Sequence, residues 1–178
     1  MLVRQIRSIL DQVTKSLFLG GNMALEVGTT SPEIRLFNNE RQVVTLEDFK
    51  GQTSVLVFFP GAFTGGCKDE ACTFRDSLAQ YERLGVQVYG VSVDSFFVQN
   101  AFISDNELNF PFLSDYSRET IESFGIGVRN FAGMEGYTTS QRAVVVLDKE
   151  GVVRFVTAVA PTEQPDFDQI RTAIEQLQ

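Results

Sequence analysis

The run from Thr53 to Phe59 constrains the fold more than any other segment of the chain. Its sequence, Thr-Ser-Val-Leu-Val-Phe-Phe, is almost continuously apolar and rich in branched and aromatic residues. Such a run is typical of a central strand that is covered on both faces. Pro60 follows and ends the strand, because proline has no N–H group for the hydrogen-bond ladder.

Further strands and helices alternate along the chain, which predicts an α/β domain. Two more apolar runs, 86–93 and 141–147, have the composition of buried strands, and the turn at 148–151 predicts a hairpin into a strand at 152–156. The other expected strands are 33–37, 43–45 and 112–115, and the expected helices are 65–83, 95–106, 118–124 and 166–177. The pattern therefore indicates a mixed central β-sheet flanked by helices.

Both cysteines of the chain, Cys67 and Cys72, follow this first apolar run, and the chain contains no histidine. A nucleophilic cysteine here cannot be activated by a Cys–His pair. A helix N-terminus or a nearby guanidinium would have to favour its thiolate. Two close cysteines in an otherwise ordinary chain favour redox chemistry in a cytoplasmic protein over a secreted disulfide scaffold. Two soft ligands are too few for an ordinary zinc site, so we expect no metal.

The segment between Pro60 and Cys67 has the features of a ligand site. In open α/β sheets, ligands bind beyond the carboxyl ends of the strands, where this segment begins. Thr64 is a suitable N-cap for the following helix, which would place Cys67 at the third helical position. A thiol there lies near free backbone N–H groups and the positive end of the helix dipole. Gly65 and Gly66 leave room for a small substrate.

Composition excludes several other classes of protein. The chain has 178 residues, enough for one domain with a substantial core. Its net charge of −8 argues against nucleic-acid binding. No apolar run approaches the roughly 20 residues of a membrane span. Gly125-Ile-Gly127 is not a dinucleotide fingerprint, since it lacks the third glycine, so no nicotinamide or flavin cofactor is expected.

The pattern Pro60-x-x-x-Thr64-x-x-Cys67 resembles the active-site motif of the peroxiredoxins, which are thiol peroxidases with a thioredoxin-like fold. The resemblance extends over roughly residues 23–178 and includes Arg142 at the head of an apolar strand. Further similar segments are Cys67-x-x-Glu70, Phe74-Arg75-Asp76 and Gly28-x-x-Ser-Pro32.

The resemblance implies a catalytic role for each residue of the motif. Cys67 would attack a peroxide oxygen and become a sulfenic acid. Thr64 would hydrogen-bond the thiolate and the peroxide, and Pro60 would shield the cysteine from water. Arg142 would supply a fixed guanidinium near the sulfur and the peroxide oxygens. Glu70 would either orient an arginine or only favour the start of the helix.

Cys72 is in the relative position of the resolving cysteine in peroxiredoxins of the bacterioferritin-comigratory, or Q, type. That resemblance implies an intramolecular disulfide with Cys67. In a regular helix, however, residues five positions apart have Cα atoms about 8.7 Å apart, whereas disulfides rarely span more than about 7 Å. We therefore expect the first turns of the helix to unwind during turnover. The alternatives are a one-cysteine peroxidase and a non-enzymatic redox sensor or relay protein.

The family also implies the partners. The substrates would be hydrogen peroxide or organic hydroperoxides, and thioredoxin or glutaredoxin would be the reductant. Phe59, Phe63 and Phe131 suggest tolerance for alkyl hydroperoxides. A glutathione-peroxidase-like protein is disfavoured, because that family uses a tryptophan and this chain has none.

Residues 1–22 precede the region of resemblance. Apolar residues recur there at helical spacing, which predicts an amphipathic helical extension packed on the domain or on a second subunit. A targeting or membrane-surface segment and a translation start at Met23 are the other interpretations. The protein would be a monomer or a homodimer, and the loop 131–137 would line either the peroxide entrance or an interface.

Overall fold

The computed structural model describes residues 25–177, so the expectations for residues 1–22 lie outside the described part. The helices are η1 (Leu46–Phe49), α2 (Gly65–Arg83), α3 (Phe96–Asp105), α4 (Glu119–Ser123), η2 (Phe131–Gly133) and α5 (Phe167–Glu175). The strands are β1 (Arg35–Phe37), β2 (Val43–Thr45), β3 (Thr53–Phe58), β4 (Val86–Ser92), β5 (Phe112–Ser114), β6 (Gly127–Val128), β7 (Thr139–Ser140), β8 (Arg142–Leu147) and β9 (Val153–Val159).

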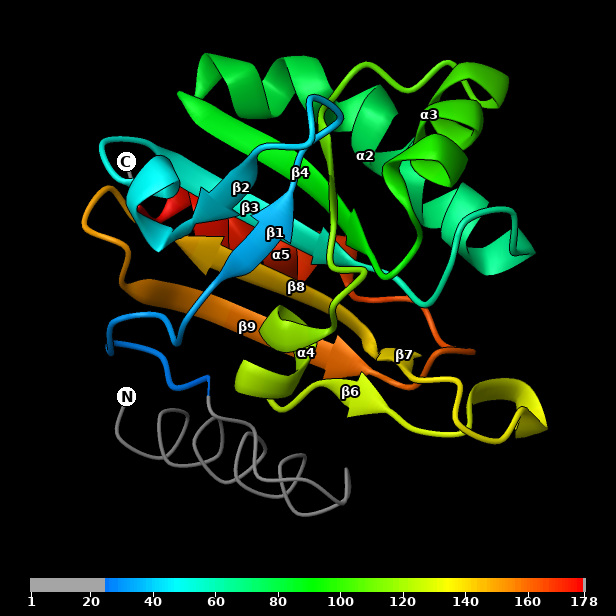
Figure 1. Ribbon diagram of the computed structural model, residues 1–178. Coiled ribbons are helices and arrows are strands. Elements are labelled where there is room, and N and C mark those ends of the chain that lie inside the picture. Colours follow the sequence, from blue (N-terminus) through cyan, green and yellow to red (C-terminus); the bar gives the residue numbers. More distant parts are fainter. Residues whose placement is uncertain (1–24, 178) are drawn as a thin grey trace, which may run out of the picture.

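The described part of the chain forms a seven-stranded mixed sheet with the strand order β2-β1-β5-β4-β3-β8-β9 (Figure 1). β3, β4 and β5 run parallel, whereas β8 and β9 pair antiparallel to their neighbours. The expected mixed central sheet is thus confirmed. β3 lies between β4 and β8, and all six of its residues are buried. Burial on both faces of the sheet explains why its sequence is almost continuously apolar.

The sheet has a hydrophobic core on each face, and alternate residues of one strand point into each. On β3, Val55 and Val57 belong to the core under α2, α3 and α5, whereas Leu56 and Phe58 belong to the core under α4. This alternation follows from the period of two along a strand. In Figure 1, α4 lies in front of the sheet and α5 behind it. Cys67 belongs to the core on the α2 side.

Most expected elements are present, with boundaries that differ by at most three residues and that coincide for 43–45 and 65–83. The hairpin at 148–151 is confirmed, and Gly151 has a φ of +78°, which suits a glycine. The two-residue strands β6 and β7, which pair antiparallel, were not predicted. They are too short to show an apolar period in the sequence. They nevertheless place Tyr137 beside the loop before α2, where its hydroxyl oxygen lies 3.9 Å from the position of a Cβ on Gly61.

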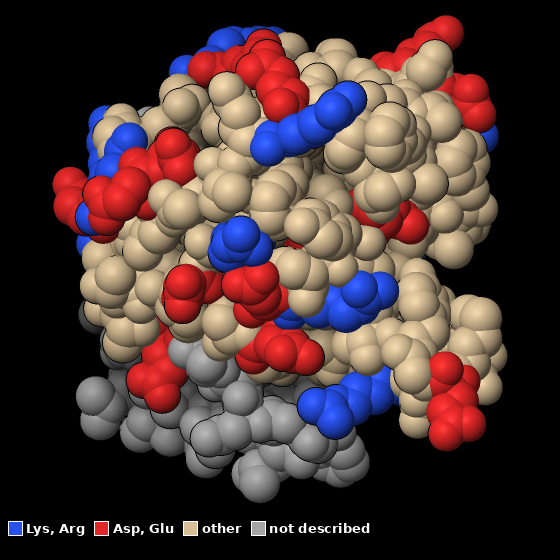
Figure 2. Space-filling view, in the orientation of Figure 1, with Lys and Arg blue, Asp and Glu red and all other residues tan. Residues whose placement is uncertain are grey.

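Charges are mixed on the surface, and the site region is hollowed. On the face shown in Figure 2, basic side chains are interspersed with acidic ones and form no continuous basic patch. The same view shows a hollow between the first turn of α2 and the η2 segment. Among residues 25–177, no helix is both long and apolar enough to cross a membrane.

The core on the α4 side can be tested at Phe124, whose side chain is fully buried and packs on Phe58 at 5.6 Å between ring centroids. We expect Phe124→Ala to lower the free energy of unfolding by about 3–5 kcal/mol, because it removes a buried ring and leaves a cavity. Urea denaturation measures this loss. Phe97, which is 67% exposed, is the control, and Phe97→Ala should change the free energy by less than about 0.5 kcal/mol. Equal losses in the two variants would contradict the assignment of the core.

Candidate active site

The loop that follows β3 is tied to the sheet by two side chains. The Thr139 hydroxyl on β7 donates a hydrogen bond to the carbonyl of Pro60. The backbone N–H of Ala62 donates to Asp94 Oδ2 at 2.7 Å, just beyond the end of β4. Asp94 follows the end of β4, and Thr139 lies just before the start of β8, which pairs with the end of β3. The loop is therefore held at the carboxyl end of β3, as the sequence predicted.

Phe63 carries backbone strain within this loop. Its φ is +61°, in the left-handed region that costs an ordinary residue about 1–2 kcal/mol. Its ring is 55% exposed and meets Phe102 edge-on, with 5.4 Å between centroids. Thr64, Gly65 and Lys68, with residues of α3, line a groove of about 390 Å³ beside this ring. Strain of this kind clusters at functional sites, because only surrounding contacts can maintain it.

Thr64 occupies the N-cap position of α2, but its side chain does not cap the helix. Instead, the hydroxyl donates to the carbonyl of Gly61 at 3.1 Å. Thr64 therefore occupies the expected N-cap position, but its side chain does not make the hydrogen bond to a helix N–H that an N-cap residue usually makes. The hydroxyl has a single hydrogen and gives it to the loop. The first N–H groups of α2 thus remain available to a ligand, and the hydroxyl oxygen keeps its lone pairs.

Cys67 and Arg142 meet at the start of this helix. Cys67 lies in the first turn of α2 and is fully buried. Arg142 begins β8, and it is 2% exposed, so it is not a solvated charge at a strand end. Its Nη1 donates to Glu70 Oε2 at 2.5 Å in a buried ion pair. Glu70 therefore orients the arginine, which was one of its two expected roles.

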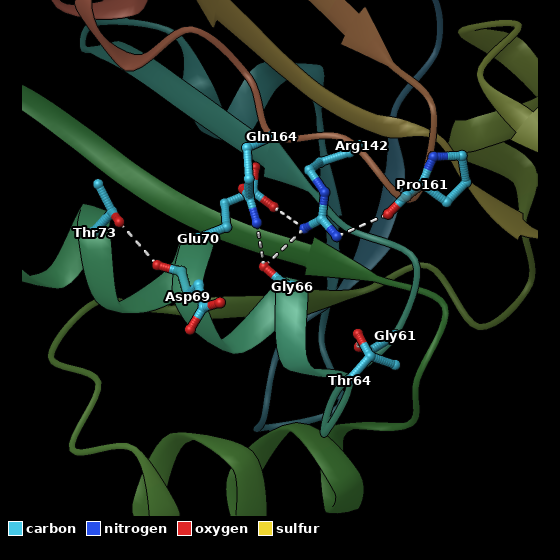
Figure 3. A network of polar contacts seen from close by, with 9 residues as sticks. All are labelled: Gly61, Thr64, Gly66, Asp69, Glu70, Thr73, Arg142, Pro161 and Gln164. Carbon is cyan, nitrogen blue, oxygen red and sulfur yellow. Dashed lines mark hydrogen bonds and ion pairs between the residues drawn. The ribbon is translucent and has the colours of Figure 1, made fainter.

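The loop between β9 and α5 completes the setting of Arg142 (Figure 3). Arg142 Nη2 donates to the carbonyl of Pro161 at 3.0 Å, and Nη1 also lies 3.3 Å from the carbonyl oxygen of Gly66. Gln164 Nε2 donates to the same Gly66 oxygen at 2.8 Å. A Cβ atom on Gly66 would lie 3.0 Å from Arg142 Nη2. A glycine at 66 is thus what lets the guanidinium approach the helix.

The electrostatics of the pair follow from its burial. Burial raises the pKa of Glu70 from 4.5 to about 7, although the charge and hydrogen bond of Arg142 act in the opposite direction. Burial lowers the pKa of Arg142, but Glu70 and then Cys67 raise it by more, so that it lies above its ordinary value. Arg142 consequently stays charged at any physiological pH, next to the sulfur of Cys67.

Two buried polar atoms of the pair have no hydrogen-bond partner among the described residues. They are Arg142 Nε, a donor, and Glu70 Oε1, an acceptor. Buried polar groups in native proteins are nearly always satisfied, so unpaired ones beside the Cys67 thiol indicate a place for a ligand. Arg142 Nε is the donor that a negatively charged sulfur or a peroxide oxygen can use.

Cys72 lies in the same continuous helix as Cys67, and both thiols are free. It is partly buried against the core on the α2 side. The helical geometry that opposes a direct Cys67–Cys72 disulfide is therefore present. The helix must open before these two sulfur atoms can bond.

Sequence reasoning missed three residues whose side chains bond to the backbone around the motif: Asp94, Thr139 and Gln164. Each lies in a loop or at a strand end, and only the fold brings it to the motif. Phe59, Phe63 and Phe131 were the aromatic residues expected to suit alkyl substrates. For Phe59 this expectation is wrong, because its side chain is 2% exposed and packs between Phe102 and Phe112 in the core. Phe131 is half-buried against Tyr137.

Residues 27–156 match the model of the AhpC/TSA family. A protein named putative peroxiredoxin bcp from Coxiella burnetii is 35% identical over 134 residues, which are 75% of this chain and 89% of that protein. The chloroplastic peroxiredoxin Q of Triticum aestivum is 35% identical over 129 residues, 72% of this chain and 57% of that protein.

Comparison with a solved structure supports the same family. The crystal structure of a peroxiredoxin-like protein from Aquifex aeolicus superposes with a TM-score of 0.75 and 28% identity. The superposition covers 86% of this chain and 88% of the Aquifex aeolicus chain. The arrangement of β-sheet and helices described above is thus the thioredoxin-like fold of these proteins.

The burial of Glu70 predicts a particular dependence of stability on pH. An acid whose pKa is raised on folding binds its proton more tightly in the folded state, so it destabilises the protein as pH rises through the range from 4.5 to about 7. Glu70→Gln removes this titration. The free energy of unfolding of the unmodified protein, minus that of the variant, should fall by up to about 3 kcal/mol between pH 4 and 8. Urea denaturation at several pH values measures the difference, and a constant or rising difference would contradict the assignment.

The close approach at Gly66 gives a second prediction. In Gly66→Ala, the new methyl group displaces the Arg142 guanidinium, whereas a Cβ on Gly65 meets no atom within 4 Å. We expect Gly66→Ala to slow the reaction of Cys67 with hydrogen peroxide about 10- to 100-fold, because such displacements cost about that much. The control, Gly65→Ala, should react within about twofold of the unmodified protein. Competition for peroxide with a peroxidase of known rate measures both constants, and equal effects at the two glycines would refute the argument.

Proposed function

This chain belongs to the AhpC/TSA family and is a peroxiredoxin, a thiol-dependent peroxidase, and we propose that Cys67 is its peroxidatic cysteine and Cys72 its resolving cysteine. The observation that carries the assignment of Cys67 is the buried Arg142–Glu70 pair beside its thiol. No other cysteine of the chain lies in the first turn of a helix.

In the first step, the Cys67 thiolate attacks one oxygen of the peroxide and the O–O bond breaks. The sulfur is oxidised to a sulfenic acid, and the other oxygen leaves as water or an alcohol after it takes up a proton. Arg142 and the free N–H groups at the start of α2 both favour the negative charge on sulfur. No histidine is needed for this activation.

A favoured thiolate alone does not account for a fast peroxidase. An ordinary cysteine, with a pKa of about 8.5, is already a few per cent ionised at pH 7, so full ionisation gains only about 30-fold. The larger contribution comes from donors aimed at the leaving oxygen, where one donor is worth about 10²- to 10³-fold. The unpartnered Nε of Arg142 and the amides of α2 are these donors.

Thr64 and Pro60 shape the pocket in this mechanism. Because the Thr64 hydroxyl donates to Gly61, its oxygen can accept a hydrogen bond from the peroxide O–H. That bond orients the oxygen under attack toward sulfur. Pro60, fixed through its carbonyl by Thr139, shields the thiolate from water.

In the second step, the Cys72 thiol attacks the sulfenic sulfur, the S–O bond breaks, and water leaves as the disulfide forms. The position of Cys72 within continuous helix requires the first turns of α2 to unwind before this step. A dithiol protein, thioredoxin or glutaredoxin, then reduces the disulfide. The substrates are hydrogen peroxide and organic hydroperoxides.

The test is intact mass after one equivalent of hydrogen peroxide is added to the fully reduced protein. We expect a loss of two hydrogens in the unmodified protein, from the Cys67–Cys72 disulfide. Cys72→Ser should instead gain one oxygen, and Cys67→Ser should not react. Turnover with thioredoxin should fall at least about 10-fold in Cys72→Ser, because the sulfenic acid then waits for an external thiol.

Each other outcome has a definite meaning. A gain of one oxygen that persists in the unmodified protein would show a one-cysteine peroxidase. Formation of the disulfide without repeated turnover by any dithiol reductant would favour a redox sensor. Reaction of Cys67→Ser at the unmodified rate would refute the assignment of the peroxidatic cysteine.

A further inference from the structure

The carbonyl oxygen of Gly66 receives more hydrogen bonds than an ordinary helix position does. Within a helix, the carbonyl of residue 66 accepts one bond, from the amide four residues later. Here it also accepts from Gln164 Nε2 at 2.8 Å, and Arg142 Nη1 lies 3.3 Å away. Both extra donors come from outside α2 and meet at the peptide unit that links Gly66 to Cys67 (Figure 3).

Gln164 differs from Arg142 in what else it contacts. Arg142 is buried and holds Glu70 and Pro161 besides Gly66. Gln164 is exposed, lies in the loop between β9 and α5, and has the Gly66 oxygen as the partner of its side-chain amide. Its contribution is therefore confined to holding the first turn of α2 in place.

This first turn is the part that must move when Cys67 and Cys72 form a disulfide. Opening from the N-terminal end breaks fewer helix bonds than opening from within, because α2 continues to Arg83 and is anchored by Phe74 in the core. Any such opening carries the Gly66 carbonyl away from Gln164. The bond between them exists only while the turn is closed.

We propose that Gln164 is a latch that holds the first turn of α2 closed and thereby sets how the Cys67 sulfenic acid is consumed. The inference rests on the proposed function. With the turn closed, the sulfenic acid is kept apart from Cys72 and can react with a second peroxide, which oxidises it to a sulfinic acid and is itself reduced to water or an alcohol. With the turn open, Cys72 displaces water and forms the disulfide. The latch favours the first outcome and slows the second.

The latch acts on resolution and leaves the first oxidation unchanged. Gln164 makes no hydrogen bond to Cys67, Thr64 or Arg142 in the described structure. The bonds of Arg142 to Glu70 and Pro161 do not involve the amide of Gln164. The closed site that attacks peroxide is then the same, and only the rate of opening differs.

The test compares Gln164→Met with Gln169→Met. Both variants replace an exposed glutamine by a side chain of similar length without an amide, and the Gln169 side chain makes no hydrogen bond among the described residues. Rapid acid quench followed by intact mass gives three quantities for each protein: the rate of the first oxidation, the rate of disulfide formation, and the fraction of sulfinic acid at high peroxide.

We expect Gln164→Met to form the disulfide about two- to tenfold faster, the factor that the loss of one hydrogen bond gives. The ratio of sulfinic acid to disulfide should fall by the same factor, and the rate of the first oxidation should stay within about twofold. Gln169→Met should match the unmodified protein in all three quantities.

The measurements distinguish a failure of the latch proposal from a failure of the proposed function. If the unmodified protein forms no Cys67–Cys72 disulfide, the proposed function is wrong and the latch with it. If the disulfide forms at the same rate in Gln164→Met, the latch alone is wrong. If the first oxidation slows in parallel with resolution, Gln164 supports the closed site and is not a latch. Thermal unfolding of both variants, expected to be equal within about 2 °C, identifies a general loss of stability.

Discussion

The site depends on one buried interaction, the ion pair between Arg142 and Glu70. Two charges removed from water cost several kcal/mol each, and their mutual attraction offsets this only with good geometry and further hydrogen bonds. The structure supplies those bonds through the carbonyls of Gly66 and Pro161. The pair therefore fixes three separate segments relative to one another: the first turns of α2, the start of β8, and the loop before α5. The same pair places a fixed positive charge beside Cys67.

The helix α2 has to satisfy two opposed demands. Its closed first turn presents amides and the helix dipole to the Cys67 sulfur, and in the proposed cycle its opening brings Cys67 to Cys72. The contacts around the turn match this conflict. Cys67, Ala71 and Phe74 all pack in the core on the α2 side, whereas Gly65 and Gly66 have no side chains to bury and the Gly66 carbonyl is held by polar bonds. A segment with few apolar contacts opens at low free energy, so in the proposed cycle the two glycines at the start of α2 open more easily than the turns after them, and the core contacts of Cys67 are lost as it moves.

The sequence predicted the elements whose signal is local. The apolar runs of β3, β4 and β8 mark buried strands by composition, and the motif from Pro60 to Cys67 marks the site because every residue of it lies in one segment. The residues that could not be predicted are distant from the motif in sequence and reach it only through the fold. Asp94, Thr139 and Gln164 are ordinary polar residues in loops, and nothing near them in the sequence indicates that they bond to the motif. The direction of the Thr64 hydroxyl was missed for a related reason, since both the helix amides and the Gly61 carbonyl are suitable partners and the loop conformation decides between them.

The absence of histidine from the chain shapes how this site responds to pH. A Cys–His pair changes its charge near neutrality, whereas Arg142 itself stays charged throughout, so a change with pH in the charge beside Cys67 comes from its partner Glu70. Glu70 is the member of the pair that titrates near neutrality, with a pKa of about 7. When it is protonated, Arg142 keeps its full positive charge for the thiolate. When it ionises, the pair is neutral as a unit, and less of that charge is left to act on sulfur. Protonation of Glu70 below about pH 7 therefore raises the net positive charge beside the Cys67 sulfur, whereas Arg142 alone would give a charge that is constant with pH.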